Sequence, residues 1–402
     1  MQHRGFTFTI HSEYHNTVNA GITACKKEVT MKRILKIGAD VHSSNYTLCA
    51  VEPLLEGDVN ELFTVDVEPR YQEILRFIEK LKKRFPGDEL SITCGYEAGC
   101  LGYKLFHDLE AHDVKCVILA PSTMEVPGGK RIKTDKRDAL LIAKCLAKGG
   151  FSAVHVPTKN DEAVRDYLRM RDDHKQSVKT LKQQINAFCL RHGYKYERTK
   201  WTQVHMKWLR EIELSEIDRE TLNSYLATYG LMTDALERYD ARIEELSYMD
   251  EYREKVQKLR CFVGIKTHTA LSLIVETGDF SRFVKGNYYG SFVGLVPGED
   301  SSGPHTNRCP ITKAGNKHLR TLLTECAQAI GRSRPGYKSK ELKSRQKGCP
   351  PEIVAYADRA NDRLRRKFHK MVYRGKHKNV ATTAVARELA CFVWGMMTDN
   401  IA

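Results

Sequence analysis

Four acidic residues in the first third of the chain have the types and the spacing to do chemistry. Asp40 and Glu97 each end an apolar, strand-like run, while Asp135 and Asp138 stand three residues apart in a helix-like stretch. Carboxylates at the ends of adjacent strands, with a pair on one helix face, form a site for hard divalent cations. Such sites cut or join phosphodiesters by two-metal chemistry, so nucleic-acid strand transfer is the first hypothesis. The spacing alone also fits ordinary surface acids, with Asp135 capping a helix.

The elements that must position these acids lie within residues 32–150, which predict alternating strands and helices. Three β-rich runs are followed by a helix, a strand, a helix, a strand and a helix, an order that matches a mixed-sheet α/β domain. The ribonuclease H-like fold has this order, with acids on its first strand, its fourth strand and a late helix. The expected strands cover residues 34–41, 45–52, 61–67, 90–96 and 115–119, and the expected helices begin near residues 71, 101 and 135.

The middle of the chain predicts two long helices. Residues 162–191 contain no Gly or Pro, and their apolar residues recur in steps of three and four, with Arg171 and His174 in the same seam. A second stretch, residues 232–246, places five apolar or aromatic residues on one face. This pattern favours a helical hairpin or an intermolecular coiled coil. An ordinary bundle within one chain is about as compatible with it.

Two glycine-bearing segments follow the long helices. Gly264 lies in a turn that opens a short expected helix at residues 270–276, and such a turn can present backbone N–H groups to a phosphate, as in a helix–hairpin–helix clamp. Farther on, Ser302 stands directly before Gly303 in a Gly- and Ser-rich loop that Lys313 and Arg320 follow. A hydroxyl there could attack a phosphate while the cations stabilise charge on its oxygens. A plain Ser/Gly turn explains the same loop.

The charge of the chain indicates an anionic partner. The formal net charge is +15 and the pI is about 9.2, a balance that most often means nucleic acid. Residues 331–378 hold 16 Lys or Arg residues against 4 Asp or Glu residues. Aromatic residues lie among these cations, which suits backbone contacts combined with base stacking: Tyr337, Tyr356, Phe368 and Tyr373. A solvated or partly disordered basic tail is the alternative.

Other features of composition predict a cytoplasmic protein. The chain has 12 cysteines but no Cys-x-x-Cys pair, which fits reduced thiols. No apolar run approaches ~18 residues, so no membrane span is expected. The first 30 residues lack the apolar core of a signal peptide. Because Met31 resembles a natural chain start, we expect residues 1–30 to be either a disordered extension or the product of a misassigned start.

The chain resembles the insertion sequence one-ten family of transposases, the bridge-RNA-guided serine recombinases. The resemblance covers residues 32 to about 330, and its pieces occur in the family's order. In the N-terminal part they are Ile37-Gly38-Ala39-Asp40-Val41-His42, Tyr96-Glu97-Ala98 and Lys133-Thr134-Asp135-Lys136-Arg137-Asp138-Ala139. In the C-terminal part they are Gly264-Ile265, Glu276-x-Gly278-Asp279-x-Ser281-Arg282-Phe283, Gly294-Leu295-Val296-Pro297, Ser301-Ser302-Gly303 and Ile311-Thr312-Lys313-Ala314-Gly315-Asn316. Arg308-Cys309-Pro310 replaces a glycine that family members often carry.

The resemblance implies a recombinase that excises and inserts its own mobile element. The family's Asp-Glu-Asp-Asp metal site maps onto Asp40, Glu97, Asp135 and Asp138, which would hold Mg²⁺ or Mn²⁺. Its nucleophilic serine maps onto Ser302, with Ser301 as the alternative. The implied partners are donor and target DNA, a noncoding bridge RNA and further copies of the chain in a dimer or tetramer. The implied location is the bacterial or archaeal cytoplasm, near the nucleoid, without a membrane.

The predicted fold class is α/β. It comprises a ribonuclease H-like (RuvC-like) N-terminal domain, a helical coiled-coil middle, and a mainly α C-terminal transposase domain with a helix–hairpin–helix-like element. The predicted divisions are residues 1–30 (a disordered extension), 31–155 (the metal-binding domain), 156–258 (the coiled coil) and 259–402 (the serine transposase domain with a basic tail). Nucleic-acid contacts are predicted at Lys130, Arg131, Lys133, Lys136, Arg137, Gly264, Lys313, Arg320, Arg363, Arg365, Arg366 and Lys367.

Two other functions remain open at this point. A metal-dependent, RuvC-like junction-resolving nuclease would keep the four acids, use water as the nucleophile and give Ser302 no role. A decayed transposase that only binds nucleic acid is the non-enzymatic alternative.

Overall fold

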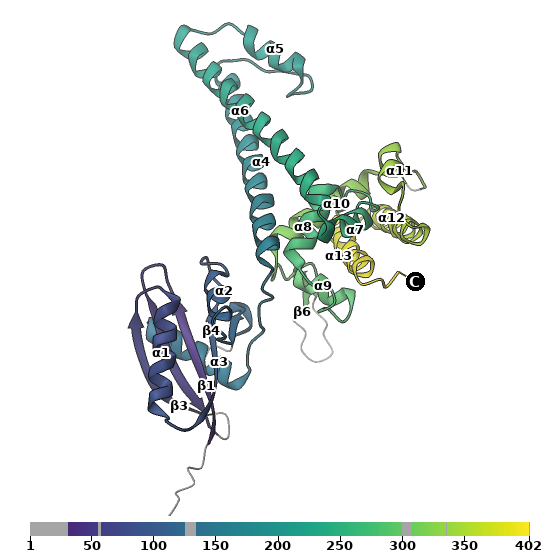
Figure 1. Cartoon of the computed structure of the whole chain (residues 1–402). Helices are drawn as coiled ribbons and strands as arrows, with labels where there is room; N and C mark the ends of the chain where they lie inside the picture. Colours follow the sequence, from purple (N-terminus) through teal and green to yellow (C-terminus); the bar gives the residue numbers. More distant parts are fainter. Residues whose placement is uncertain (1–30, 55–57, 125–133, 300–307, 335, 402) are drawn as a thin grey trace, which may run out of the picture. The chain divides into compact units, whose positions relative to one another are not determined.

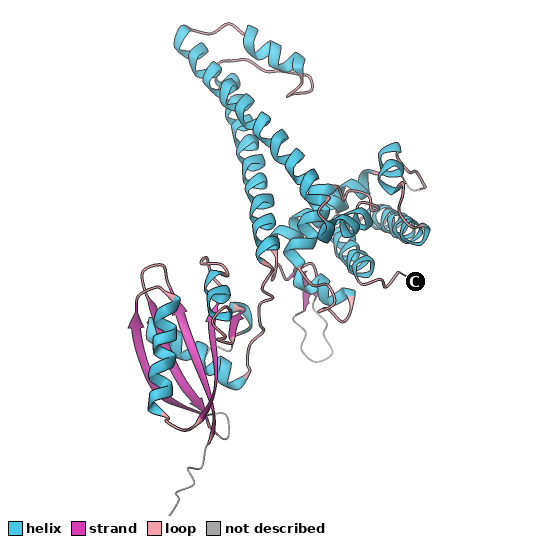
Figure 2. Cartoon of the chain, in the orientation of Figure 1, coloured by secondary structure: helices cyan, strands magenta, loops and turns pink. Residues whose placement is uncertain are grey.

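The chain folds into two compact units, Met1–Val156 and Pro157–Ala402. Figures 1 and 2 show the computed structural model, in which the first unit carries the main sheet and the second is almost entirely helical. The expected α/β N-terminal part and mainly helical C-terminal part are therefore confirmed. The predicted boundary between residues 258 and 259 lies inside the second unit and stays a prediction. The structure describes residues 31–54, 58–124, 134–299, 308–334 and 336–401, so the predicted extension at 1–30 lies outside it.

The first unit is built on a five-stranded sheet with the strand order β3-β2-β1-β4-β5. β1 pairs antiparallel with β2, which pairs antiparallel with β3, whereas β4 lies parallel to β1 and β5 parallel to β4. This order is consistent with the expected ribonuclease H-like domain. The strands are β1 (Lys32–Val41), β2 (Tyr46–Pro53), β3 (Val59–Val67), β4 (Glu89–Glu97) and β5 (Cys116–Leu119).

Helices cover both faces of this sheet. Because successive side chains of a strand point to opposite faces, Leu35, Ile37 and Ala39 of β1 pack into the core shared with the first two helices. The third helix covers the other face, where it packs on Cys49 and Val51 of β2. The helices are α1 (Tyr71–Arg84), α2 (Lys104–Glu110) and α3 (Asp135–Lys148), with a short 3₁₀ turn η2 (Pro121–Thr123).

The second unit begins with a long helical hairpin. α4 (Lys159–Arg191) and α6 (Glu216–Ser247) run side by side in opposite directions, and α5 (Gln203–Glu211) lies near the tip (Figure 1). The polar seam residues expected from the sequence contact each other within the hairpin: Arg171 pairs with Asp240 at 2.7 Å, and the ring of His174 packs against Tyr239. The seam thus has partners within one chain, and an intermolecular coiled coil stays a prediction.

The rest of the second unit is a helical bundle with a small hairpin of two strands. Its main core joins side chains from most of the helices around α8 and α13. These elements are α7 (Asp250–Leu259), α8 (Thr267–Thr277), α9 (Gly286–Phe292), β6 (Pro297–Glu299), β7 (Arg308–Ile311), α10 (Lys317–Arg332), α11 (Lys340–Gln346), α12 (Pro351–Tyr373) and α13 (Lys378–Met397).

The apolar helix α13 is a core helix of this bundle. Among the described residues it is the one helix long and apolar enough to cross a membrane by composition. Its side chains at Val385, Leu389 and Val393 are completely buried against the other helices. Burial inside the bundle accounts for this apolar composition.

The basic segment at residues 331–378 is not an extended tail. It forms α11 and α12 and contributes Ile353, Ala357 and Leu364 to the core. Tyr356 and Phe368, two of the aromatics expected to stack on bases, also pack into that core, whereas Tyr337 and Tyr373 are exposed.

Candidate active site

Asp40 is placed by the alternation of side chains along β1. Since Leu35, Ile37 and Ala39 point toward α1 and α2, Gly38 and Asp40 point toward α3. The parallel register of β1 and β4 sets Gly38 beside Gly95 and Ala39 beside Tyr96. Asp40 and Glu97 therefore end neighbouring strands at the same edge of the sheet, as the sequence predicted.

A glycine in β1 allows α3 to approach the sheet closely enough to bring its acids to this edge. A Cβ at Gly38 would lie 2.1 Å from the carbonyl oxygen of Ala139 and 2.4 Å from the backbone nitrogen of Ala143. Nothing larger than glycine fits there while α3 keeps its place. At Gly95 a Cβ would meet side-chain atoms of Leu146 at 2.9 Å. Gly38 and Gly95 together form the part of the sheet surface against which α3 packs.

The acids of α3 occupy its first turn. The Thr134 side chain accepts a hydrogen bond from the backbone N–H of Arg137, so Thr134 is the N-cap and Asp135 is not. Asp135 and Asp138 each lie four residues before a buried residue of α3, Ala139 and Ile142, which directs both acids to the sheet side of the helix. The partial positive charge of the helix N-terminus favours carboxylates at this position.

Asp40, His42 and Asp135 converge on one point. One ligand atom from each residue lies within 4.8 Å of the others. Oδ2 of Asp40 is buried and has no hydrogen-bond partner in the described part of the chain, while Nε2 of His42 lies 3.4 Å from it. Burial, with the negative charges of Asp138 and Asp135, raises the pKa of Asp40, and His42 opposes this shift. A carboxylate held this way is stabilised by a cation.

Two residues of this region were missed by the sequence analysis. His42 was noted only as part of a motif, yet its imidazole touches Asp40. Asp66 of β3 accepts a 2.7 Å hydrogen bond from Thr47, and Thr47 pairs with Asp40 in the β1–β2 register. The Asp66 carboxylate also lies 3.9 Å from the Nζ of Lys136. A small cavity of about 480 Å³ touches Asp66 and Asp135 together. Asp66 is thus a further carboxylate beside the predicted quartet.

The predicted nucleophiles Ser301 and Ser302 lie outside the described residues, but the frame around them is described. The antiparallel strands β6 and β7 flank the loop, with Pro297 opposite Ile311. Below this hairpin, the two glycines Gly294 and Gly315 have positive φ and pack so tightly that a Cβ on Gly315 would lie 2.0 Å from the carbonyl oxygen of Phe292. The sequence predicted a Gly- and Ser-rich loop in this region, and in the structure these two glycines make close backbone contacts.

The segment before α10 is held by a buried charge network. Glu276, with a side chain only 3% exposed, accepts two hydrogen bonds from Arg169 of α4, at 2.7 and 2.9 Å. It also accepts one at 2.8 Å from the side chain of Asn316, which caps α10. Although burial opposes ionisation of Glu276, these partners outweigh it and keep its pKa below the usual value. The network fixes where the Lys313–Asn316 segment ends and α10 begins.

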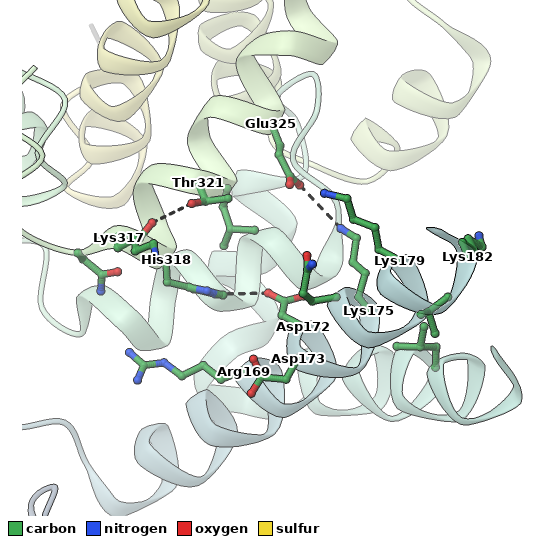
Figure 3. A pocket seen from close by; sticks show the side chains of 15 residues that line it. Arg169, Asp172, Asp173, Lys175, Lys179, Lys182, Lys317, His318, Thr321 and Glu325 are labelled. Carbon is green, nitrogen blue, oxygen red and sulfur yellow. Dashed lines mark hydrogen bonds and ion pairs between the residues drawn. The ribbon is translucent and has the colours of Figure 1, made fainter. Parts of the chain in front are cut away.

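A partly buried carboxylate, Asp172, lies beside this network and lines a cavity of about 1030 Å³ between α4 and α10 (Figure 3). Asp172 lies 3.2 Å from the Nε2 of His268 and 3.6 Å from that of His318. Burial opposes the ionisation of Asp172, but these histidines and Arg171 hold its pKa below the usual value. Burial in turn lowers the pKa of His318.

The predicted nucleic-acid contacts fall into three groups. Lys130, Arg131 and Lys133 lie outside the described residues. Lys136, Arg137, Lys313 and Arg366 are exposed. The remaining side chains are engaged within the fold: Arg320 donates to the carbonyl oxygen of Val293, Arg363 and Lys367 pair with Glu388, and Arg365 is buried with its guanidinium on Ser333 and Asp362.

The turn at Gly264 differs from a simple phosphate-presenting loop. Gly264 has φ +85°, and a Cβ there would lie 2.9 Å from the backbone of Cys326 in α10. The N–H of Val263 donates to Oδ1 of Asn361 at 2.9 Å, and the carbonyl oxygen of Ile265 accepts from Arg345. These two bonds engage an N–H group and a carbonyl group of the turn with side chains of the same unit. The helix–hairpin–helix interpretation stays a prediction.

Comparison with known proteins agrees with this architecture. Residues 37–192 match a family model of DEDD type described as a transposase, and residues 256–342 match the model "Transposase IS116/IS110/IS902 family". The chain is 32% identical to the putative transposase y4qE of Sinorhizobium fredii over 90% of this chain and 88% of that protein. It is 34% identical to the transposase for insertion sequence element IS1533 of Leptospira borgpetersenii, over 85% of this chain and 97% of that protein.

A more distant relative is the pilin gene-inverting protein of Moraxella bovis, 26% identical over 63% of this chain and 72% of that protein. The first match contains the four acids and most of the sheet, and the second contains the first part of the helical bundle with its strand hairpin. With two relatives above 30% identity that match along nearly their whole length, the chain belongs to the IS110 family of transposases.

Proposed function

We propose that this transposase breaks and rejoins DNA strands with an acidic cluster that holds divalent cations and with Ser302 as the nucleophile. Members of its family are enzymes that cleave and rejoin DNA. The observation that carries the proposal is the convergence of Asp40, His42 and Asp135, with an oxygen of Asp40 buried and lacking a hydrogen-bond partner among the described residues. The pKa of Asp40 is raised even though the imidazole of His42 lies beside it, and a carboxylate in this state suits a metal site better than a structural ion pair.

The donor set fits a hard divalent cation. Asp40 and Asp135 would hold it, and Asp138 and Glu97, on the same side of the sheet edge, would add oxygen ligands. His42 would orient Asp40 through its imidazole. A bound Mg²⁺ or Mn²⁺ supplies charge stabilisation at the phosphoryl oxygens. The raised pKa of Asp40 means that the carboxylate is most easily kept charged when such an ion is present.

The serine step conserves the phosphodiester bond energy. The hydroxyl oxygen of Ser302 attacks the phosphorus, the bond from phosphorus to the 3′ oxygen breaks, and a 5′-phosphoserine forms; the proton lost by the serine balances the one gained by the departing 3′ oxygen, which leaves as a 3′ hydroxyl. A free 3′ hydroxyl of the exchanged strand then attacks the same phosphorus and releases the serine. One phosphoester replaces another in each step, so no nucleotide cofactor is required. The likeness to a pilin gene-inverting protein supports rejoining as well as cleavage, because an inverted segment is joined again at both ends.

Two further partners belong to this proposal. A noncoding bridge RNA selects donor and target DNA, and two or four copies of the chain assemble around them. The net charge of +15 supports contact with an extended polyanion. Incubation of the purified complex with ribonuclease tests the guide, since strand exchange should stop while metal binding by the protein continues. Strand exchange that continues at the same sites without RNA would exclude guidance.

Replacement of the serine tests the mechanism directly. Ser302→Ala should abolish both cleavage and the covalent protein–DNA adduct, while Ser301→Ala, one residue away, should retain them. If Ser302→Ala still cuts DNA, the protein is a metal-dependent junction-resolving nuclease. If only Ser301→Ala loses the adduct, Ser301 is the nucleophile. The adduct is measured by its slower migration on a denaturing gel with end-labelled DNA.

Replacement of one acid tests the metal site separately. Asp40→Asn should lose the Mn²⁺ binding of the parent protein, measured by calorimetry or electron paramagnetic resonance, and should also lose cleavage. Asp113→Asn is the matched control, because Asp113 is an exposed residue in a turn after α2 and asparagine tolerates its positive φ. Equal Mn²⁺ binding by the parent and Asp40→Asn would refute the assignment.

A further inference from the structure

We infer that the second unit carries a built phosphate-binding cavity, formed by the Gly264 turn with α10, α11 and α12, which takes an internal phosphodiester of a bound nucleic-acid strand. The inference deepens the proposed function and rests on nucleic acid being the partner. The cavity has a volume of about 630 Å³. Five cations and a single acid line it: Lys266, Arg332, Arg334, Arg345, Arg365 and Glu341.

The charges around this cavity are not balanced from within. Glu341 pairs with Lys266 at 2.9 Å, which neutralises one of the five cations. Arg365 uses its guanidinium on Ser333 and, at 3.4 Å, on Asp362. Arg332 donates only to a carbonyl oxygen of its own helix, and no ion pair to Arg334 is found in the described residues. An excess of positive charge therefore surrounds the empty volume.

Arg345 gives the second indication of an anion. One of its terminal nitrogens donates to the carbonyl oxygen of Ile265, but its Nε is buried and has no hydrogen-bond partner among the described residues. Burial lowers the pKa of Arg345, and the nearby charge of Glu341 offsets this only in part. An arginine stays protonated in proteins, and a buried donor left unpaired is costly. Because Arg345 lines the cavity, a phosphate there would stabilise the charge of its guanidinium and balance the excess positive charge.

The surroundings favour an internal phosphodiester over a free phosphate ion. Tyr337 lines the cavity and is 61% exposed, so its ring offers a face on which a base next to the bound phosphate can stack. The hydroxyl of Ser339 also lines it and suits the oxygens of the sugar–phosphate backbone, whereas the hydroxyl of Ser333 donates to the carbonyl oxygen of Ile330. None of these groups reads a base edge, which predicts binding without sequence preference.

The test removes cations that the fold does not need. Arg332 and Arg334 are exposed, so the double variant Arg332→Gln/Arg334→Gln should keep the melting temperature of the parent. Its affinity for a labelled DNA duplex and for a labelled RNA strand, measured by fluorescence anisotropy, should fall about tenfold or more, equally for unrelated sequences. The slope of log affinity against log salt should shrink by about one to two. Arg210→Gln, an exposed arginine of α5 away from the cavity, should leave both quantities unchanged.

The possible outcomes separate this inference from the proposed function. Unchanged affinity and slope in the double variant, with normal binding by the parent, would overturn the cavity alone. A parent that binds neither DNA nor RNA would overturn the proposed function as well. A third measurement uses inorganic phosphate at millimolar concentration. If phosphate raises the melting temperature of the parent as much as DNA or RNA does, and the double variant abolishes this shift, the cavity holds a free phosphate ion and the phosphodiester assignment fails.

Discussion

A methyl group added to Gly38 is the most direct test of how the acidic cluster is assembled. Gly38→Ala changes no charge and no ligand. Its Cβ would lie 2.1 Å from the carbonyl oxygen of Ala139 and 2.4 Å from the nitrogen of Ala143, both backbone atoms of α3 that no side-chain rotation can move. The substitution therefore acts on the acids only by pushing α3 away from β1.

The size of the effect follows from these distances. Restoring an ordinary contact of 3.4 Å with the carbonyl oxygen of Ala139 requires α3 to retreat by about 1.3 Å. Overpacking of this kind costs about 1–3 kcal/mol of stability. A shift of that length also separates Asp135 from Asp40, whose ligand atoms with those of His42 now lie within 4.8 Å. Misplacement of catalytic groups by ~1 Å lowers rates about 100-fold, so the loss of strand transfer should far exceed the loss of stability.

The assay compares strand transfer, Mn²⁺ affinity and melting temperature in three variants. Gly38→Ala should lower all three. Gly95→Ala should be milder, because its Cβ meets the mobile ends of Leu146 and Leu119 at 2.9–3.0 Å. Gly230→Ala is the control: it lies within α6 with nothing near its Cβ, and should stabilise that helix by about 0.5–1 kcal/mol with activity unchanged. Gly38→Ala with parental Mn²⁺ affinity and strand transfer would refute the argument that this glycine places the acids.

Two predictions concern the networks of the second unit. Arg169→Met should destabilise this unit by about 1–3 kcal/mol, because it leaves the buried charge of Glu276 without its main partner, and adding Glu276→Gln should restore part of the loss. Urea unfolding of the two single variants and the double variant measures these losses. Strictly additive losses would show that the pair does not interact. The folded pKa of His318 is lowered, so as the pH falls from 7 through its unfolded value of about 6.5 the unfolded chain gains a proton first and stability is lost. His318→Gln should flatten that part of the melting-temperature profile, and parallel profiles would contradict the assignment.

The first unit was largely predictable from its sequence because its side-chain alternation is regular. Apolar residues at every second position of β1 define its buried face, and a helical stripe marks α1, so the order of strands and helices follows. The contact of Asp66 with the site was not predictable in the same way. It depends on the β1–β2–β3 register, in which Asp40 faces Thr47 and Thr47 faces Asp66. The register between paired strands cannot be read from the spacing of residues within each strand.

The C-terminal cations are the opposite case, because the spacing of residues in their sequence already indicated which of them would be buried. In α12, Ile353, Ala357, Asn361 and Arg365 follow one another at intervals of four, which places all four on the same face of the helix. That face is buried, so Arg365 is part of the interior, whereas Arg363 and Arg366 lie off this face and reach solvent. Net charge over a segment predicts a partner, but the helical period decides which charges can meet it.

The acidic cluster of the first unit and the cations of the second unit must serve different tasks in any reaction on DNA. A phosphate that approaches Asp40, Asp135 and Asp138 meets negative charge of its own sign, so this cluster repels DNA until cations occupy it. The energy that holds the strand must therefore come from elsewhere in the protein. In the second unit, the Gly264 turn has part of its backbone engaged by Asn361 and Arg345, and this leaves side-chain guanidinium groups as the main phosphate donors around the cavity. If this division holds, removal of cavity cations weakens binding at every metal concentration, whereas removal of an acid weakens binding only where the metal would have occupied the site.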